Sequence, residues 1–330
     1  MSATIVIGGQ YGDEGKGKIM SYLALHDEPD VIARGGGGPN AGHSVEHEGH
    51  KYAIRLVPSG FVNRKARLGI GAGVLIDADV FLREVEQFGL GMRCIIDKRA
   101  TLITQEMKDA DAASETARKI GTTKMGIGPA QAARSLRTAP TVEADERLKK
   151  YLGDVATLVN GAKKVLVEGS QGFMISNLYG CYPYVTGKDV SASAICSEVG
   201  LGPLKVDDVV MVIKAYTTRV GGGPLAGELP VEEAQKRGMQ EYGTVTGRPR
   251  RTNPNLIWDE LKMAAQINSA SLIALTKLDV KFPACAKKRN YDELPAEAKQ
   301  FVGEIEQKLG VPVGLIGTGP DAQDIIDRRQ

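Results

Sequence analysis

Short, almost uninterrupted apolar runs recur along the chain, and amphipathic segments separate them. The runs are residues 4–7 (TIVI), 31–33 (VIA), 164–168 (KVLVE), 209–215 (VVMVIKA) and 271–276 (SLIALT). Runs of this kind are typical of parallel strands that are covered on both faces. Amphipathic helices are expected between them, including residues 18–25, 256–267 and 295–309. The pattern predicts an α/β fold, in which helices flank a mostly parallel central sheet and ligand loops follow the strands.

Composition narrows the class of protein without naming a function. The 330 residues are 42% hydrophobic and 25% charged, and their net charge of +2 indicates neither a nucleic-acid nor a membrane surface. No apolar stretch approaches the length of a membrane span. Four cysteines without CxxC spacing suit reduced thiols in a cytoplasmic protein and argue against a structural zinc site. Without repeats or low-complexity linkers, a single domain over residues 1–330 with embedded subdomains is expected.

The loop after the first run reads GGQYGDEGKGK, residues 8–18. A phosphate-binding P-loop pattern fits from Gly12 to Lys18, but Ile19 stands where that pattern requires Ser or Thr. The glycines allow close backbone approach, and the lysines supply charge for phosphate. Acids in such a loop repel phosphate unless they hold a cation or take a proton. A solvated turn with ordinary surface charges is the alternative interpretation.

A second glycine-rich loop, RGGGGPNAGHS, covers residues 34–44. Asn40 and Ser44 can supply neutral hydrogen bonds, and His43 can donate to an oxygen on which negative charge develops. A lone histidine is more often structural, and the other three histidines are interpreted that way. Two of them, His47 and His50, are expected in a solvated hairpin.

Two later segments add recognition chemistry. Residues 276–279 (TKLD) resemble the guanine-reading element of GTP-using proteins, in which a carboxylate accepts hydrogen bonds from N1–H and the exocyclic amine. Residues 244–251 (TVTGRPRR) cluster three arginines, and arginine forks suit carboxylates and phosphates. A chance four-residue match and a basic surface loop are the respective alternatives.

Taken together, the chain resembles the adenylosuccinate synthetase family from residue 4 to about residue 322. The elements GGQYGDEGKGK, NAGHS, IGTTKMGIGPA, EGSQG, YPYVT, TRVGGGP, TVTGRPRR, TKLD and TGPD occur in the family's order. The resemblance implies a P-loop-NTPase-like fold and a homodimer. It also implies a two-step reaction with Mg²⁺, in which GTP phosphorylates the 6-oxygen of IMP and the amine of L-aspartate then displaces that phosphate.

The resemblance also implies roles for individual residues. Asp13 would remove the N1 proton of IMP and contact Mg²⁺, and His43 would stabilise charge on the transferring phosphoryl group. Lys16 and the Gly42 backbone would hold phosphate and metal, and Gln171 would orient the 6-oxygen region. The GTP-binding residues would be Gly12, Glu14, Gly15, Lys16, Gly17, Lys277, Asp279, Gly317, Gly319 and Pro320. IMP would bind to Asp13, Asn40, Thr123, Gln171, Thr186, Val220, Gly221 and, from the neighbouring subunit, Arg137. L-aspartate would bind to Thr246, Arg248 and Arg250.

Three departures from the family's pattern and two rival functions bear on this interpretation. Pro249 replaces a common arginine, Ser44 replaces threonine, and Lys124–Met125 stands where Gly–Arg is frequent. One rival is the phage relative that aminates dGMP, but that branch has a non-acidic residue at the position of Asp13. The other is a GTP-binding switch protein, which has no use for the NAGHS and arginine segments. Asp13 therefore favours IMP as the substrate.

Overall fold

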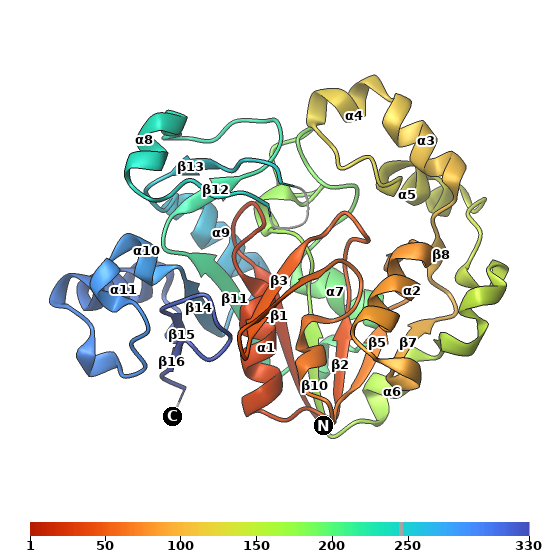
Figure 1. Ribbon diagram of the computed structural model, residues 1–330, viewed down its shortest axis with the longest axis horizontal. Helices are drawn as coiled ribbons and strands as arrows, with labels where there is room; N and C mark the ends of the chain where they lie inside the picture. Colours follow the sequence, from red (N-terminus) through yellow and green to blue (C-terminus); the bar gives the residue numbers. More distant parts are fainter. Residues whose placement is uncertain (244–246, 330) are drawn as a thin grey trace.

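The computed structural model describes residues 1–243 and 247–329, which build a ten-stranded sheet between layers of helices (Figure 1). The strand order is β16-β15-β14-β11-β1-β10-β2-β5-β7-β9, and every pair is parallel except β15 with β16. The strands are β1 (Ser2–Gly8), β2 (Val31–Arg34), β5 (Arg67–Ile70), β7 (Cys94–Asp97), β9 (Leu152–Gly153), β10 (Lys164–Glu168), β11 (Asp208–Lys214), β14 (Leu272–Thr276), β15 (Val313–Gly317) and β16 (Ile325–Asp327). The predicted mostly parallel α/β fold is confirmed.

Two hydrophobic cores cover the two faces of this sheet. Along β1, Ala3, Ile5 and Ile7 enter one core and Val6 enters the other, because successive side chains of a strand point to opposite faces. The first core is completed by α6 (Val155–Gly161), α7 (Ala192–Val199), α9 (Trp258–Asn268) and α11 (Ala296–Leu309). The second core is completed by α1 (Lys16–His26) and α2 (Ala78–Gln87). Burial on both faces explains why the strands read as continuous apolar runs.

Smaller units lie above the carboxyl ends of the strands (Figure 1). On one side, α3 (Gln105–Ala113), α4 (Glu115–Ile120) and α5 (Ile127–Leu136) adjoin the parallel pair β6 (Leu75–Ile76) and β8 (Thr101–Leu102). On the other side, β12 (Thr217–Arg219) and β13 (Arg251–Asn253) form an antiparallel pair, and α8 (Val231–Lys236) packs against β13. These units are the embedded subdomains that the sequence predicted.

Short elements complete the fold. The predicted hairpin around His47 and His50 is formed by β3 (His43–His47) and β4 (His50–Ile54). The remaining helices are α10 (Leu278–Lys281) and the 3-10 helices η1 (Ser59–Val62), η2 (Gly91–Arg93), η3 (Val142–Ala144), η4 (Glu146–Tyr151), η5 (Phe173–Ile175), η6 (Pro203–Lys205), η7 (Pro283–Cys285) and η8 (Tyr291–Glu293). Within the described residues, no helix has both the length and the apolar character needed to cross a membrane.

Candidate active site

A cavity of about 920 Å³ opens at the carboxyl ends of the central strands. Its floor comes from the segments that follow β1, β2, β10, β11 and β14, and its walls include α4, the start of α5 and residues 182–187, 241–243, 248 and 250. Ligands of open parallel sheets bind at this edge. The fold therefore brings the separate glycine-rich segments of the sequence into one site.

Most of the site residues predicted from the sequence line this cavity. Those that line it are Gly12, Asp13, Gly15, Lys16, Gly17, Asn40, Gly42, His43, Thr123, Gln171, Thr186, Val220, Arg248, Arg250, Lys277, Gly319 and Pro320. Five others, namely Glu14, Arg137, Gly221, Asp279 and Gly317, are not among the lining residues, and Thr246 lies outside the described residues.

The two acids of the first loop point in opposite directions. Glu14 is fully buried, and its carboxylate accepts hydrogen bonds from the backbone N–H of Gly12 at 2.8 Å and from Lys16 Nζ at 2.7 Å. Glu14 therefore shapes the loop from inside, and its charge is neutralised before any phosphate arrives. A Cβ on Gly172 would lie 2.1 Å from the Gly12 nitrogen, so only glycine lets the segment after β10 pack against this loop. That close packing brings Gln171 to the cavity.

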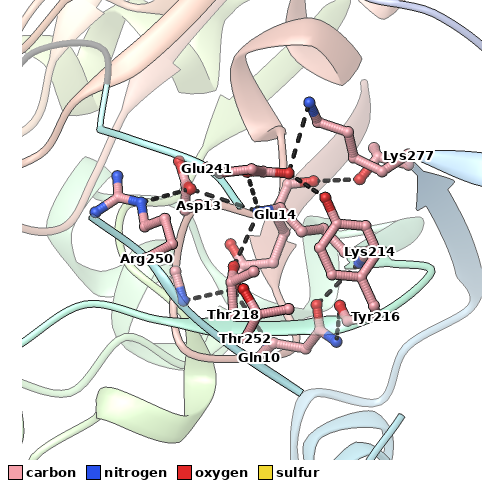
Figure 2. Close-up of polar contacts among 12 residues, drawn as sticks. Gln10, Asp13, Glu14, Lys214, Tyr216, Thr218, Glu241, Arg250, Thr252 and Lys277 are labelled. Carbon is pink, nitrogen blue, oxygen red and sulfur yellow. Dashed lines mark hydrogen bonds and ion pairs between the residues drawn. The ribbon is translucent and has the colours of Figure 1, made fainter. Parts of the chain in front are cut away.

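Asp13 faces the cavity with a left-handed backbone (φ 64°) and a side chain that is 31% exposed. Its Oδ2 accepts a hydrogen bond from Arg250 Nε at 2.8 Å and lies 3.4 Å from Lys214 Nζ (Figure 2). Burial acts to raise the pKa of this carboxyl, but the charges of Lys214 and Arg250 outweigh it and hold the pKa below its usual value. Asp13 is thus an ionised carboxylate at neutral pH, able to accept a proton.

Lys214 and Glu241 form an ion pair beside Asp13 that the sequence did not predict. Lys214 ends β11 with a side chain only 2% exposed, and its Nζ donates to Glu241 Oε2 at 2.7 Å and to Thr218 Oγ1 at 2.9 Å. Glu241 also accepts from the Tyr216 hydroxyl. A lysine inside the apolar run VVMVIKA was a usable signal, because a buried ammonium needs a partner. Nothing in the sequence pointed to Glu241.

His43 begins β3 and is backed by a buried carboxylate. Its Nδ1 contacts Glu168 at the end of β10 and lies 3.2 Å from Ser59 Oγ. Glu168 also accepts from the Ser59 backbone N–H and hydroxyl, each at 2.6 Å, and lies 3.7 Å from Arg34. Burial opposes ionisation of Glu168, but His43 and Arg34 lower its pKa to about 2. Sequence analysis missed Glu168, although a charged residue ending the run KVLVE was again the signal.

The two predicted aspartate-binding arginines diverge within the cavity. Pro249 pairs with Tyr242 in an isolated antiparallel bridge, so Arg248 and Arg250 flank one extended residue. Arg248 NH1 donates to the Gly121 carbonyl at 2.8 Å, which joins the arginine segment to the α4 side of the cavity. Arg250 turns instead to Asp13. Proline at this position is compatible with the bridge, because the hydrogen bonds around it come from neighbouring residues.

The TKLD segment forms the opposite end of the cavity. The Lys277 side chain is 44% exposed, with its Nζ 3.6 Å from Glu241 Oε1. Asp279 Oδ1 is buried and has no hydrogen-bond partner among the described residues, and the same holds for Asn40 Oδ1. Lys18 Nζ donates to the Gly319 carbonyl at 2.5 Å, which fixes the TGPD segment against α1. A buried acceptor without a partner is costly, so it indicates a site for a ligand's donor group.

Comparison with known proteins gives matches over the whole chain. Residues 5–144 and 139–284 match the family model described as adenylosuccinate synthetase. The chain is 51% identical over 340 residues to the adenylosuccinate synthetase of Pyrococcus sp. (strain ST700), with 100% of this chain and 99% of that protein covered. It is 50% identical over 337 residues to that of Methanococcus aeolicus, with 100% of each covered.

Two solved structures resemble the whole fold. A fully ligated adenylosuccinate synthetase from Plasmodium falciparum has a TM-score of 0.91 and 28% identity, and 99% of each chain is covered. The succinoaminodeoxyadenylate synthetase of cyanophage S-2L, bound to dGMP and to dATP as an energy donor, has a TM-score of 0.85 and 25% identity, with 100% of this chain and 96% of that chain covered.

Proposed function

The chain belongs to the adenylosuccinate synthetase family, and we propose that the residues lining its cavity carry out both steps of the family's reaction. The enzyme ligates L-aspartate to IMP with GTP, and the products are adenylosuccinate, GDP and phosphate. A carbonyl oxygen is a poor leaving group, and phosphorylation of the 6-oxygen makes it a good one. The reaction commits IMP to the synthesis of AMP.

In the first step, Asp13 accepts the N1 proton of IMP, and the electron pair released makes the 6-oxygen nucleophilic. This oxygen attacks the γ-phosphorus of GTP, and GDP leaves. The observation that carries the assignment is the position of the Asp13 carboxylate, which faces the cavity lined by the first loop, His43 and the arginine segment. Positioning and charge stabilisation are the main demands of phosphoryl transfer. Lys16 and the backbone N–H groups at the start of α1 would position the phosphates and stabilise their charge.

His43 would stabilise the charge that develops on the transferring group. Burial and the nearby Arg34 lower the pKa of His43, whereas Glu168 acts to raise it, and Nδ1 donates its hydrogen to Glu168. The arrival of anionic phosphate at the cavity would raise that pKa and place a second donor, Nε2–H, against the phosphoryl oxygens. Gln171 would orient the 6-oxygen region from the same side.

In the second step, the neutral amine of L-aspartate attacks C6, phosphate leaves with the electron pair of its bond to C6, and the new C–N nitrogen loses a proton to the departing phosphate. Arg248, Arg250 and Thr246 would bind the carboxylates of L-aspartate, because guanidinium forks match carboxylates. Arg250 must then exchange Asp13 for the substrate. Asn40, Thr123, Thr186, Val220 and Gly221 would bind IMP.

On the GTP side, Asp279 and Lys277 would recognise guanine. Asp279 Oδ1, which has no hydrogen-bond partner among the described residues, suits the paired N–H donors of guanine, which adenine lacks. Further GTP contacts would come from Gly12, Gly15, Gly17, Gly317, Gly319 and Pro320, and Glu14 would contribute through the shape of the loop.

The residues present fit a Mg²⁺ ion that is held mainly by nucleotide phosphates. The Asp13 carboxylate and the Gly42 carbonyl line one cavity and are hard oxygen ligands, which Mg²⁺ prefers together with substrate phosphates. Within the described residues, no group of three or more His, Cys, Asp or Glu could form an all-protein metal site. When bound, the ion would neutralise charge on the phosphates.

A homodimer in the cytoplasm is also part of the proposal. Arg137 is exposed at the end of α5 and does not line the cavity of its own chain, and the adjacent Leu136 is 72% exposed. Both features suit an arginine that reaches a neighbouring site. Mixing the separately inactive variants Asp13→Asn and Arg137→Leu should restore activity if each site uses residues of two subunits.

The direct test is a substrate screen that follows phosphate release with IMP, GMP or dGMP, with and without L-aspartate, under GTP or ATP. We expect turnover that requires IMP, L-aspartate and GTP together. Turnover with dGMP and not IMP would favour the chemistry of the phage relative, and GTP hydrolysis without either co-substrate would indicate a switch protein.

A further inference from the structure

Lys214 carries a buried positive charge at the carboxyl end of β11. It ends the central strand β11, its side chain is 2% exposed, and its ammonium lies among Asp13, Thr218 and Glu241 (Figure 2). Burying an ammonium is costly unless it is paired and hydrogen-bonded. One carboxylate would satisfy that need, yet Lys214 has two, and the second, Asp13, faces the cavity.

Glu241 connects this lysine with the other end of the cavity. Its Oε2 accepts from Lys214, whereas its Oε1 accepts from the Tyr216 hydroxyl and lies 3.6 Å from Lys277 Nζ. The two oxygens of one carboxylate thus face opposite sides of the site (Figure 2). The backbone carbonyl of Glu241 also accepts from the Arg250 N–H at 2.8 Å, which fixes the arginine segment beside it.

We propose that Lys214 and Glu241 are positioning residues of the ligation: Lys214 holds Asp13 toward IMP, and Glu241 holds Lys277 toward guanine. The inference rests on the proposed roles of Asp13 and Lys277. The two side chains of this buried ion pair would therefore fix the geometry of two substrate subsites.

The arrangement has a consequence for the exchange at Arg250. Asp13 is flanked by two cations, Lys214 from β11 and Arg250 from the arginine segment. Glu241 is a nearby anion whose negative charge partly offsets their positive charge. When L-aspartate takes Arg250, Lys214 stays beside Asp13, because Glu241 and Thr218 anchor it from behind. Asp13 then keeps a partner that fixes its orientation after Arg250 has turned to the substrate.

The test uses the full-length enzyme and a set of matched variants. Lys214→Met removes the charge, Lys214→Arg retains it, and Glu241→Gln removes the partner charge while keeping the shape. The double variant Lys214→Met/Glu241→Gln removes both charges of the buried pair. Glu233→Gln is the control, because its surface ion pair with Arg237 lies on α8, away from the cavity. For each variant we would measure Tm, kcat, the three KM values and the pH dependence of kcat.

For Lys214→Met we expect kcat to fall on the order of 100-fold, as misplacement of a reacting group does. The acid limb of the pH profile of Lys214→Met should move to higher pH, since Asp13 loses a neighbouring positive charge. Lys214→Arg keeps that charge and should restore much of kcat and much of the position of the acid limb. Glu241→Gln should raise KM for GTP by up to about fivefold, because Lys277 loses a partly exposed ion pair. Glu233→Gln should match the wild type.

The double variant separates positioning from stability. We expect its Tm to recover toward the wild type while kcat stays low and the acid limb stays shifted. Recovery of kcat and of the acid limb together with Tm would overturn the proposal and make the pair structural. A wild type without ligase activity would overturn both this inference and the proposed function, whereas an active wild type with an unshifted Lys214→Met profile would overturn this inference alone.

Discussion

The two ends of the cavity differ in how their charged groups are prepared for substrate. At the proposed guanine end, Asp279 keeps a buried oxygen without a partner among the described residues, and Lys277 is partly exposed beside Glu241. At the proposed phosphoryl-transfer end, Asp13 and His43 are both engaged, Asp13 by Lys214 and Arg250 and His43 by Glu168. One end offers an acceptor without a partner among the described residues, whereas the other holds its proposed reactive groups against charged side chains.

The difference between the two ends follows from their proposed roles, which are guanine recognition at one end and catalysis at the other. Recognising guanine needs fixed acceptors, and an unpaired acceptor penalises any base that cannot donate to it. Catalysis needs a carboxylate that stays ionised while buried, which requires nearby cations. Because Arg250 is one of those cations and also a proposed ligand of L-aspartate, binding of the second substrate would release one constraint on Asp13.

The substitution with the largest expected effect tests whether Asp13 acts as a base or only balances the charges of Lys214 and Arg250. Asp13→Asn should lower turnover by about 1000-fold, because the amide cannot accept the N1 proton. Affinity for GDP should persist, since the guanine end is untouched. Phosphate release and calorimetry would measure the two, and Asp109→Asn on the exposed face of α3 is the matched control. Near-normal turnover would contradict the assignment.

The next effect tests the guanine end by itself. Asp279→Asn should reduce the preference for GTP over ATP on the order of 100-fold, because two charge-assisted hydrogen bonds to guanine are lost or weakened. Turnover at saturating GTP should change far less than in Asp13→Asn. Ratios of kcat/KM for GTP and ATP give the measurement, with Asp292→Asn in the exposed η8 region as control. An unchanged ratio would show that another group reads the base.

The sequence predicted the segments that meet at the cavity better than it predicted the contacts inside it. Glycine-rich segments after buried strands must converge, because the carboxyl ends of parallel strands share one edge of the sheet. The partners behind the reactive groups were missed, since His43 and Glu168 are 125 residues apart and Lys214 and Asp13 are 201 apart. Local pattern carries no information on such pairs.

The direction of individual side chains was also beyond the sequence. Asp13 and Glu14 are adjacent acids in one loop, and both were assigned to ligand binding. Their opposite directions depend on left-handed backbone at Gly12, Asp13 and Gly15, and on Gly172 packing from another strand. The strands β5 (RLGI), β7 (CIID) and β15 (VGLIG) were also missed, although each is at least as long as β2, which was predicted.

A smaller effect tests the exchange at Arg250. Arg250→Leu should raise KM for L-aspartate by about tenfold or more, because a charge-assisted contact to a carboxylate is lost. KM for GTP should change little. Arg250→Lys should recover only part of the loss, since an ammonium keeps the charge but not the planar fork. Initial rates over a range of L-aspartate would decide this. Equal KM values in all three proteins would mean that Arg250 serves Asp13 alone.

The smallest effect tests whether the group behind His43 is an ionised carboxylate. Ser59→Ala removes a hydroxyl donor to Glu168 and should lower the free energy of unfolding at pH 7 by about 1 kcal/mol. The folded pKa of Glu168, about 2, lies below that of the unfolded chain. Its stabilisation is therefore present above the unfolded value of about 4.3 and is lost as the pH falls through that value toward 2.

Ser59→Ala raises the folded pKa of Glu168 toward the unfolded one, so the variant has less stability to lose on acidification. The difference in Tm between the two proteins should therefore be largest near pH 7 and should narrow between pH 5 and pH 3. Ser21→Ala, which removes a buried hydroxyl bonded only to backbone carbonyls among the described residues, is the control and should give a constant difference. A constant difference for Ser59→Ala as well would mean that Glu168 is already protonated at neutral pH and does not hold His43 by charge.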